Sequence, residues 1–89
     1  MWFFYIPMIH ECHNDPVRVF SLFDGRKVKP YFFEWGGRRY EVDNVLNVHS
    51  KFEGRERVHF FSVANQSEFF NLKFHTEKME WYLVEHFQE

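Results

Sequence analysis

The sequence predicts an all-β protein, folded as a small antiparallel meander of five to six strands with little or no helix. Short runs of aromatic and β-branched residues alternate with turn-forming pairs such as Asp-Gly and Gly-Gly. No segment repeats apolar residues at the i, i+3, i+4 spacing of an amphipathic helix. Strands joined by such short turns are accommodated most simply by an SH3-like barrel or a strongly bent sheet.

The chain is expected to divide into residues 1–16 and a single all-β domain of residues 17–89. Residues 2–6 are aromatic and stop at Pro7, which predicts an edge strand or an arm that covers a sheet edge. Residues 10–16, HECHNDP, are polar without periodicity and end on Asp-Pro. This pattern predicts a loop.

The strongest local signal is residues 31–48, YFFEWGGRRYEVDNVLNV, with Gly36-Gly37 at the centre. Both central residues of a type I′ turn need a positive φ, which glycine adopts without a Cβ clash. The turn fixes the register and predicts four cross-strand pairs: Trp35 with Arg38, Glu34 with Arg39, Phe33 with Tyr40, and Tyr31 with Val42.

Two features flank this hairpin. Residues 17–23 predict a strand that turns at Asp24-Gly25, and Pro30 opens the following strand. The second arm of the hairpin, residues 39–49, is predicted to form one long strand. Within this arm Asp43-Asn44 is a candidate bulge or bend, of the kind that curves a strand into a barrel.

The C-terminal part predicts a loop and two more hairpins. Residues 50–56 are charged, contain Gly54 and predict a loop. Residues 58–64 and 69–75 predict a hairpin with a three-residue loop at 65–67, which pairs Val58, Phe60 and Ser62 with Phe74, Leu72 and Phe70. A two-residue loop at 77–78 then places Phe74 opposite Trp81 and Leu72 opposite Leu83. In this interpretation His59 and His75 share one face with Phe61 and Phe69, either as a pH-sensitive patch or as half-exposed strand residues.

Composition restricts the partners. The chain has 89 residues with 13 Phe, 4 Tyr and 3 Trp, enough for a dense small core, and the surplus leaves a homodimer or partner interface open. A net charge of −2 and a pI near 6.3 do not form the basic footprint of most nucleic-acid binders. A single cysteine fits a reducing cytoplasm, and the nine-residue apolar start is too short to span a bilayer. We expect a cytoplasmic protein that does not enter the membrane.

The best metal candidate is the polar run that contains His10, Cys12 and His13, with Glu11 and Asp15 beside them. Thiolate and imidazole groups suit zinc. Adjacent ligands in a short run rarely all reach one ion, however, and neither a C-x₂-C nor an H-E-x-x-H spacing is present. A solvated polar loop is the simpler interpretation, so no cofactor is predicted.

A second candidate is a surface of arginines and aromatic residues, of the kind on which oligonucleotide-binding folds stack bases. Its members are Trp35, Arg38, Arg39, Tyr40, Arg55 and Arg57. The simpler alternative is local pairing. In that case Arg39 pairs with Glu34, Arg38 covers Trp35, and nearby glutamates offset Arg55 and Arg57.

The motif order also resembles a known family. Asp24-Gly25-Arg26, Pro30, Phe33 and the run Trp35-Gly36-Gly37-Arg38-Arg39-Tyr40 followed by Val42 and Val45-Leu46 are similar to a DGRP…F-x-W-x-G-R-x-Y-x-V-x-x-V-L pattern. That pattern belongs to a family of small uncharacterised bacterial proteins, a domain of unknown function. Phe70-x-Leu72-x-Phe74 and Trp81-x-Leu83 resemble the closing hairpin of that family. The resemblance covers residues 17–87 and departs at the N-terminal arm and at His49, where many relatives carry tryptophan.

The resemblance implies a bacterial cytoplasmic origin and brings no catalytic residues with it. Some relatives lie beside, or are fused to, Y-family DNA polymerases, which implies an accessory role in DNA damage tolerance. The chain itself lacks a nucleophile-elbow motif, a phosphate-binding glycine loop and paired carboxylates. We therefore expect a non-enzymatic binding or adaptor module that contacts a protein partner or its own copy through exposed aromatics. The alternative is a nucleic-acid-associated accessory module that uses the arginine and aromatic surface.

Overall fold

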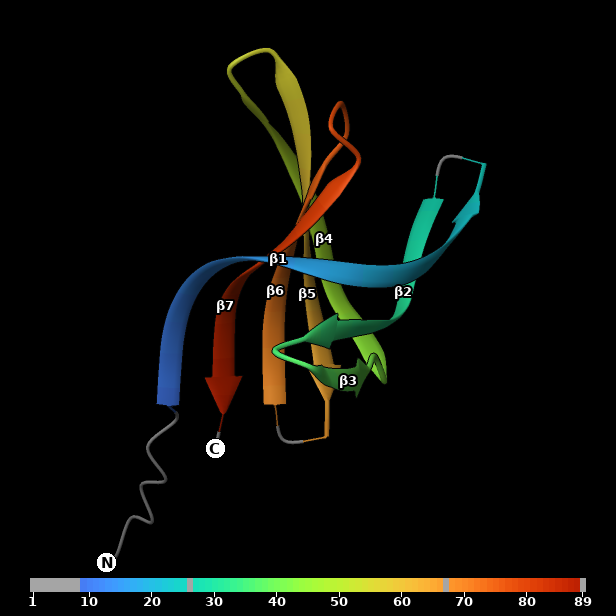
Figure 1. The fold of residues 1–89 in the computed structure, drawn as a ribbon. Helices are drawn as coiled ribbons and strands as arrows, with labels where there is room; N and C mark the ends of the chain where they lie inside the picture. The colour runs from blue at the N-terminus through green and yellow to red at the C-terminus, as the bar shows by residue number, and fades with distance from the viewer. Residues whose placement is uncertain (1–8, 26, 67, 89) are drawn as a thin grey trace, which may run out of the picture.

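The computed structural model describes residues 9–25, 27–66 and 68–88. These residues form one antiparallel sheet of seven strands in the order β3-β2-β1-β7-β6-β5-β4 (Figure 1). The strands are β1 (Ile9–Asp24), β2 (Lys27–Trp35), β3 (Arg38–Glu41), β4 (Asn44–Glu53), β5 (Glu56–Asn65), β6 (Glu68–His75) and β7 (Glu80–Gln88). The described part of the chain contains no helix, and so no helix that is long and apolar enough to cross a membrane. The all-β prediction is confirmed, with more strands than expected.

Strand β1 connects the two halves of the sheet. Its first part, up to Val17, pairs with β7, and its second part, from Arg18, pairs with β2. The register shifts between Cys12 and Asp15 and again between Phe20 and Ser21, and such bulges bend a strand. Figure 1 shows β1 curving across the molecule from β7 to β2. The β2–β3 hairpin is thereby carried to the face of β5, β6 and β7.

The loop predicted for residues 10–16 is therefore wrong, since these residues belong to β1. Residues 10–16 are polar because this part of β1 has exposed groups on both faces. The bulge after Cys12 interrupts the alternation of apolar and polar residues that would have indicated a strand. Residues 9–16 thus belong to the sheet rather than to a segment outside it. The predicted arm at residues 2–6 lies outside the described residues.

The core lies between the β2–β3 hairpin and the strands β5–β7. Phe70 is its centre, 1% exposed, with its ring centroid 5.0 Å from that of Phe33 and 5.2 Å from that of Tyr40. The predicted aromatic pair of Phe33 and Tyr40 is confirmed, with stacked rings 5.3 Å apart. The other buried members are Phe61, Val63, Leu72, Phe74, Trp81 and Leu83.

The sheet is neither closed nor strongly curled, so the expected SH3-like barrel and the alternative of a strongly bent sheet are both wrong. Strands β3 and β4 follow each other in the chain but lie at opposite ends of the strand order. The expected single arm at 39–49 is instead two strands. Val42 and Asp43 link them, and Asn44 is the first residue of β4, so Asp43-Asn44 is not a bulge within one strand. Single backbone hydrogen bonds hold this link, from Val42 N to the Tyr31 carbonyl and from Asp43 N to the Ala64 carbonyl, both at 2.9 Å. No ladder joins β4 to β2 or β3 within the described residues.

Two predicted registers are confirmed. Trp35 pairs with Arg38 and Glu34 with Arg39 around Gly36-Gly37. Phe74 pairs with Trp81 and Leu72 with Leu83, although the turn itself takes four residues, 76–79, with Met79 at φ 57°.

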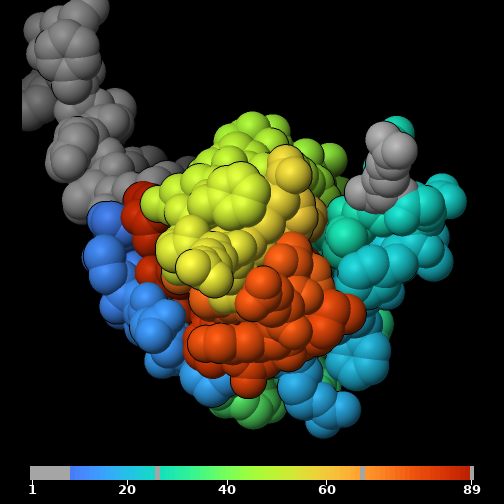
Figure 2. Space-filling model, turned by 90° about the horizontal axis from the view of Figure 1, so that it is seen from above, coloured from blue at the N-terminus to red at the C-terminus, as the bar shows by residue number. Residues whose placement is uncertain are grey.

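Three other turns differ from the expectation. Residues 50–56 form a tight hairpin in which Glu53 pairs with Glu56, because Gly54 takes a positive φ of 64°. Asp24 pairs with Lys27, so Asp24 belongs to the ladder and not to the turn that was expected at 24–25. In Figure 2 the yellow-green β4–β5 hairpin lies near the centre of the view, and the cyan β1–β2 hairpin lies apart from it at the right.

The third difference changes which side chains share a face. Asn65 pairs with Glu68, which leaves a two-residue loop where three were expected. Gln66 makes this possible with a φ of 51°. The register moves by one residue, so that Val58 pairs with His75 and Phe61 with Leu72. Because alternate residues of a strand point to opposite faces, His59 and His75 do not share a face as predicted.

Candidate functional site

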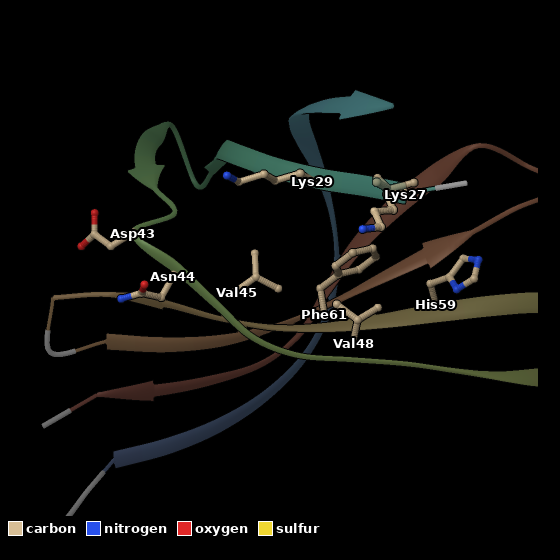
Figure 3. A pocket seen from close by; sticks show the side chains of 9 residues that line it. Lys27, Lys29, Asp43, Asn44, Val45, Val48, His59 and Phe61 are labelled. Carbon is tan, nitrogen blue, oxygen red and sulfur yellow. The ribbon is translucent and has the colours of Figure 1, made fainter. Parts of the chain in front are cut away.

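A groove of about 570 Å³ lies where the sheet is left open, between β2 on one side and β4 and β5 on the other (Figure 3). It is lined by Lys27, Val28, Lys29, Asp43, Asn44, Val45, Val48, His59 and Phe61. The groove exists because the short β3 ends at Glu41 and the chain crosses directly to the opposite edge of the sheet.

The floor of the groove is apolar. Phe61, 2% exposed, pairs with Val48, which is 50% exposed. Val45 packs against the core cluster at the other end of the floor. Phe52, 67% exposed, lies four residues after Val48 on the same face of β4 and extends the apolar surface.

The rim of the groove carries more positive than negative charge. Lys27 and Lys29 are both exposed and come from β2, while Asp43 lies at the far end. Burial lowers the pKa of His59, and the positive charge of Arg57 lowers it further. The imidazole of His59 is therefore neutral at neutral pH, and the lysines set the sign of the rim.

Strand β4 is the exposed edge beside this groove. It is ten residues long and, within the part of the chain that the structure describes, it pairs on one side only, with β5. Leu46, Val48 and Phe52 are exposed on it. Residues 44–50, NVLNVHS, contain no lysine, arginine, aspartate or glutamate. An edge strand of this kind offers unpaired backbone N–H and C=O groups to another strand.

The predicted aromatic residues are placed in the core rather than on a binding surface. Tyr40 is 6% exposed and packs on Phe33 and Phe70. Trp35 is half-buried, and its Nε1 donates a hydrogen bond of 2.9 Å to Asp15 Oδ2. Neither ring lies flat and open for a base to stack on it.

The four predicted arginines lie on two separate hairpins. Arg38 and Arg39 lie on β3, with their guanidinium carbons 5.2 Å from the Tyr40 ring centroid and 3.7 Å from the Phe32 ring centroid. Arg55 lies in the β4–β5 turn, and Arg57 follows on β5, with its Nη2 donating to Ser50 Oγ at 3.2 Å.

The expected local charge pairs are also different. Arg39 Nε donates to Glu41 Oε1 at 2.9 Å, although Glu34 lies directly across the hairpin from Arg39. Glu34 instead lies 3.5 Å from Arg18, a residue of β1 that the sequence argument did not consider.

The predicted metal residues fall on two faces of β1. His10 and Cys12 point to one face, where they meet Glu85. His13 points to the other face, where it meets Glu11 and His86. Glu85 and His86 were not predicted from the sequence, because both come from β7 and lie more than seventy positions after His10, Cys12 and His13 in the chain. The alternation of residues on β1 was the one signal that separated His13 from His10 and Cys12.

We compared the chain with models of protein families, with curated proteins and with solved structures. None matches it. The function is therefore argued from the geometry of the groove and of the β1–β7 clusters.

Proposed function

We propose that this protein is a non-enzymatic binding module that takes up an extended segment of a partner protein along β4. The segment adds as a further strand to the open edge of the sheet and places alternate side chains in the groove. The observation that carries this proposal is the ten-residue edge strand β4, which borders an apolar-floored groove.

Two kinds of interaction support strand addition here. Backbone hydrogen bonds to the free edge of β4 supply affinity for any extended chain, and pockets for alternate side chains supply specificity. Natural proteins usually block such edges with lysine, proline or short strands. In β4 the charged residues Lys51 and Glu53 lie at one end, and residues 44–50 are left without that protection.

The charge of the rim favours a particular segment. Lys27 and Lys29 face a groove whose floor is Val45, Val48 and Phe61. We infer that every second side chain of the partner segment faces the groove. These groove-facing side chains include apolar groups, which contact the floor, and carboxylates, which reach the lysines. A second copy of β4 fits less well, because residues 44–50 bring no carboxylate to the lysines.

The test uses two labelled peptides with threonine at every second position, and follows their anisotropy on titration with the full chain. The positions between the threonines alternate valine with glutamate in one peptide and valine with lysine in the other, so that both kinds of side chain face the groove. We expect the acidic peptide to bind more tightly. Val48→Lys, which places a charge on the floor, should abolish binding, and the double variant Lys27→Gln with Lys29→Gln should weaken it. His49→Lys is the matched control, since His49 stacks on Phe60 on the opposite face of β4.

Equal binding of both peptides, or an equal effect of Val48→Lys and His49→Lys, would contradict the proposal. Light scattering on the same samples tests the homodimer, and a dimer that Val48→Lys dissociates would make a second copy the occupant instead. A labelled single-stranded DNA tests the accessory role in DNA damage tolerance. DNA binding that falls steeply with salt, while neither peptide binds, would favour that alternative.

A further inference from the structure

We propose that Glu11, His13 and His86 bind a single divalent transition-metal ion, with Zn²⁺ as the best fit. Glu11 and His86 lie directly opposite each other on β1 and β7. The bulge that begins after Cys12 brings His13 to the same place. One ligand atom from each of the three side chains lies within 4.8 Å of the other two. This site is separate from the groove and does not depend on the function proposed for it.

The spacing of the ligand atoms suits a tetrahedral ion. Glu11 Oε1 lies 3.2 Å from His13 Nε2 and 3.5 Å from His86 Nδ1. Ligands at the usual zinc distances of about 2.0–2.2 Å lie roughly 3.3–3.6 Å apart in a tetrahedron. Both distances from Glu11 match this spacing, and the ligand atoms of the two histidines lie within 4.8 Å of each other.

His86 supplies the observation that points to a ligand. It is 5% exposed, and its Nδ1 atom has no hydrogen-bond partner among the described residues. Its other nitrogen, Nε2, lies 3.0 Å from Glu68 Oε1. When Nε2 carries the proton and donates it to Glu68, the Nδ1 lone pair faces Glu11. A buried lone pair that faces a carboxylate oxygen is unfavourable unless a cation or a proton lies between them.

The carboxylates that contact the two histidines follow the pattern of established metal sites, in which a carboxylate orients the ligating histidine. Glu68 has this role for His86. Asp15 has it for His13, with Oδ2 3.4 Å from Nδ1, and Asp15 is itself held by the indole of Trp35. The imidazole of His86 stacks on Phe70 at 4.6 Å, which fixes the orientation of its ring. Three protein ligands leave one position of a tetrahedral ion open to water or a small anion.

The opposite face of β1 lacks these features. His10, Cys12 and Glu85 also cluster, but the side chain of His10 is 43% exposed and that of Glu85 is 36% exposed. This cluster has no buried unpartnered atom within the described residues. It therefore serves as a matched control on the same two strands.

The experiment uses the full chain without an affinity tag, stripped of metal with a chelator. Zn²⁺ is titrated by calorimetry, and Co²⁺ by its visible absorption. We expect one equivalent of Zn²⁺ to bind. Glu11→Gln and His13→Gln should weaken binding strongly. Asp15→Asn should weaken it by roughly 10–100-fold, the usual effect of replacing a residue that orients a metal ligand. His10→Gln and Cys12→Ser should leave it unchanged.

Because replacement of the buried His86 risks unfolding the protein, its role is read in the wild type. Nitrogen-15 NMR should show Nδ1 of His86 changing from a free lone pair to a metal ligand, while Nε2 keeps its proton. Absence of stoichiometric Zn²⁺ binding, with a proton on each nitrogen of His86, would overturn the proposal. So would loss of binding in Cys12→Ser, or a thiolate-to-cobalt charge-transfer band, because either would move the ion to the other face.

Discussion

Glu56 shows how one carboxylate can hold two turns together. Its Oε1 bonds to His75 Nδ1 at 2.8 Å, and its Oε2 accepts the backbone N–H groups of Glu77 and Lys78 at 3.0 and 3.3 Å. Glu56 is the first residue of β5, next to the β4–β5 turn, and these contacts attach the β6–β7 turn to it. The hydrogen bond from His75, with smaller contributions from the two amides, lowers the pKa of Glu56 below 4.5.

Glu56→Gln should flatten the acid side of the stability profile. A carboxylate whose pKa is lowered by folding contributes stability that is present above the unfolded pKa and is lost as the pH falls through the folded pKa. The contribution of Glu56 is thus present above pH 4.5 and lost below it. Urea midpoints measured at neutral and at acidic pH should differ less in Glu56→Gln than in the wild type. Glu77→Gln is the control and should leave the difference unchanged, because the side chain of Glu77 makes none of these bonds.

At the residue scale the sequence identifies chemistry but not partners. His10, Cys12 and His13 were recognisable as metal-ligating types, yet the residues that complete each cluster come from β7. Trp35 and Tyr40 were recognisable as aromatic hairpin residues, but whether they face a ligand or the core depended on β6 and β7 packing on them. These contacts join residues distant in sequence, and no local pattern encodes them.

At the scale of elements, the β2–β3 turn is determined by its two glycines. Gly36 and Gly37 have φ values of 59° and 78°, as a type I′ turn requires. A Cβ at either position would meet no other atom within 4 Å, so the cost of a side chain is in the backbone alone.

Gly37→Ala should therefore destabilise the protein by about 1–2 kcal/mol, the cost of a left-handed backbone for an L-residue. Gly36→Asn should cost much less, because asparagine tolerates this conformation and Asn-Gly is a preferred type I′ pair. Urea unfolding of both variants measures the difference. Equal losses in the two would show that the turn does not require this backbone conformation.

Turn chemistry also explains which registers were predictable. Gly36-Gly37 specifies its loop, and the predicted pairing was confirmed. The β5–β6 turn uses Gln66 at φ 51°, a residue type that gives no such signal, and the register expected there was off by one.

At the scale of the whole molecule, Phe70 joins the two parts of the sheet. Its ring contacts Phe33, Trp35 and Tyr40 of the β2–β3 hairpin and His86 of β7. Since no ladder joins the hairpin to β4 among the residues that the structure describes, these side-chain contacts and the connection through β1 hold it in place.

Phe70→Ala should cost about 3–5 kcal/mol, as expected for a large aromatic removed from a packed core. It should also raise amide hydrogen exchange in β2 and β3 more than in β4 and β5, because the hairpin loses its main contact. Phe69→Ala is the control, since Phe69 is half-buried on the opposite face of β6 and should cost less. Uniform exchange across the sheet would mean that the two parts unfold as one unit.

Features that depend on neighbouring residues could be predicted from the sequence: the all-β class, the strands that alternate cleanly, and the hairpins whose turn residues or alternation are unambiguous. Three features became clear from the folded structure alone: residues 9–16 pair with β7, β3 and β4 lie at opposite edges, and the sheet stays open. The reason is that strand order depends on which faces can be buried together, which is a property of the whole chain. The groove beside β4 and the cluster of Glu11, His13 and His86 follow from that order.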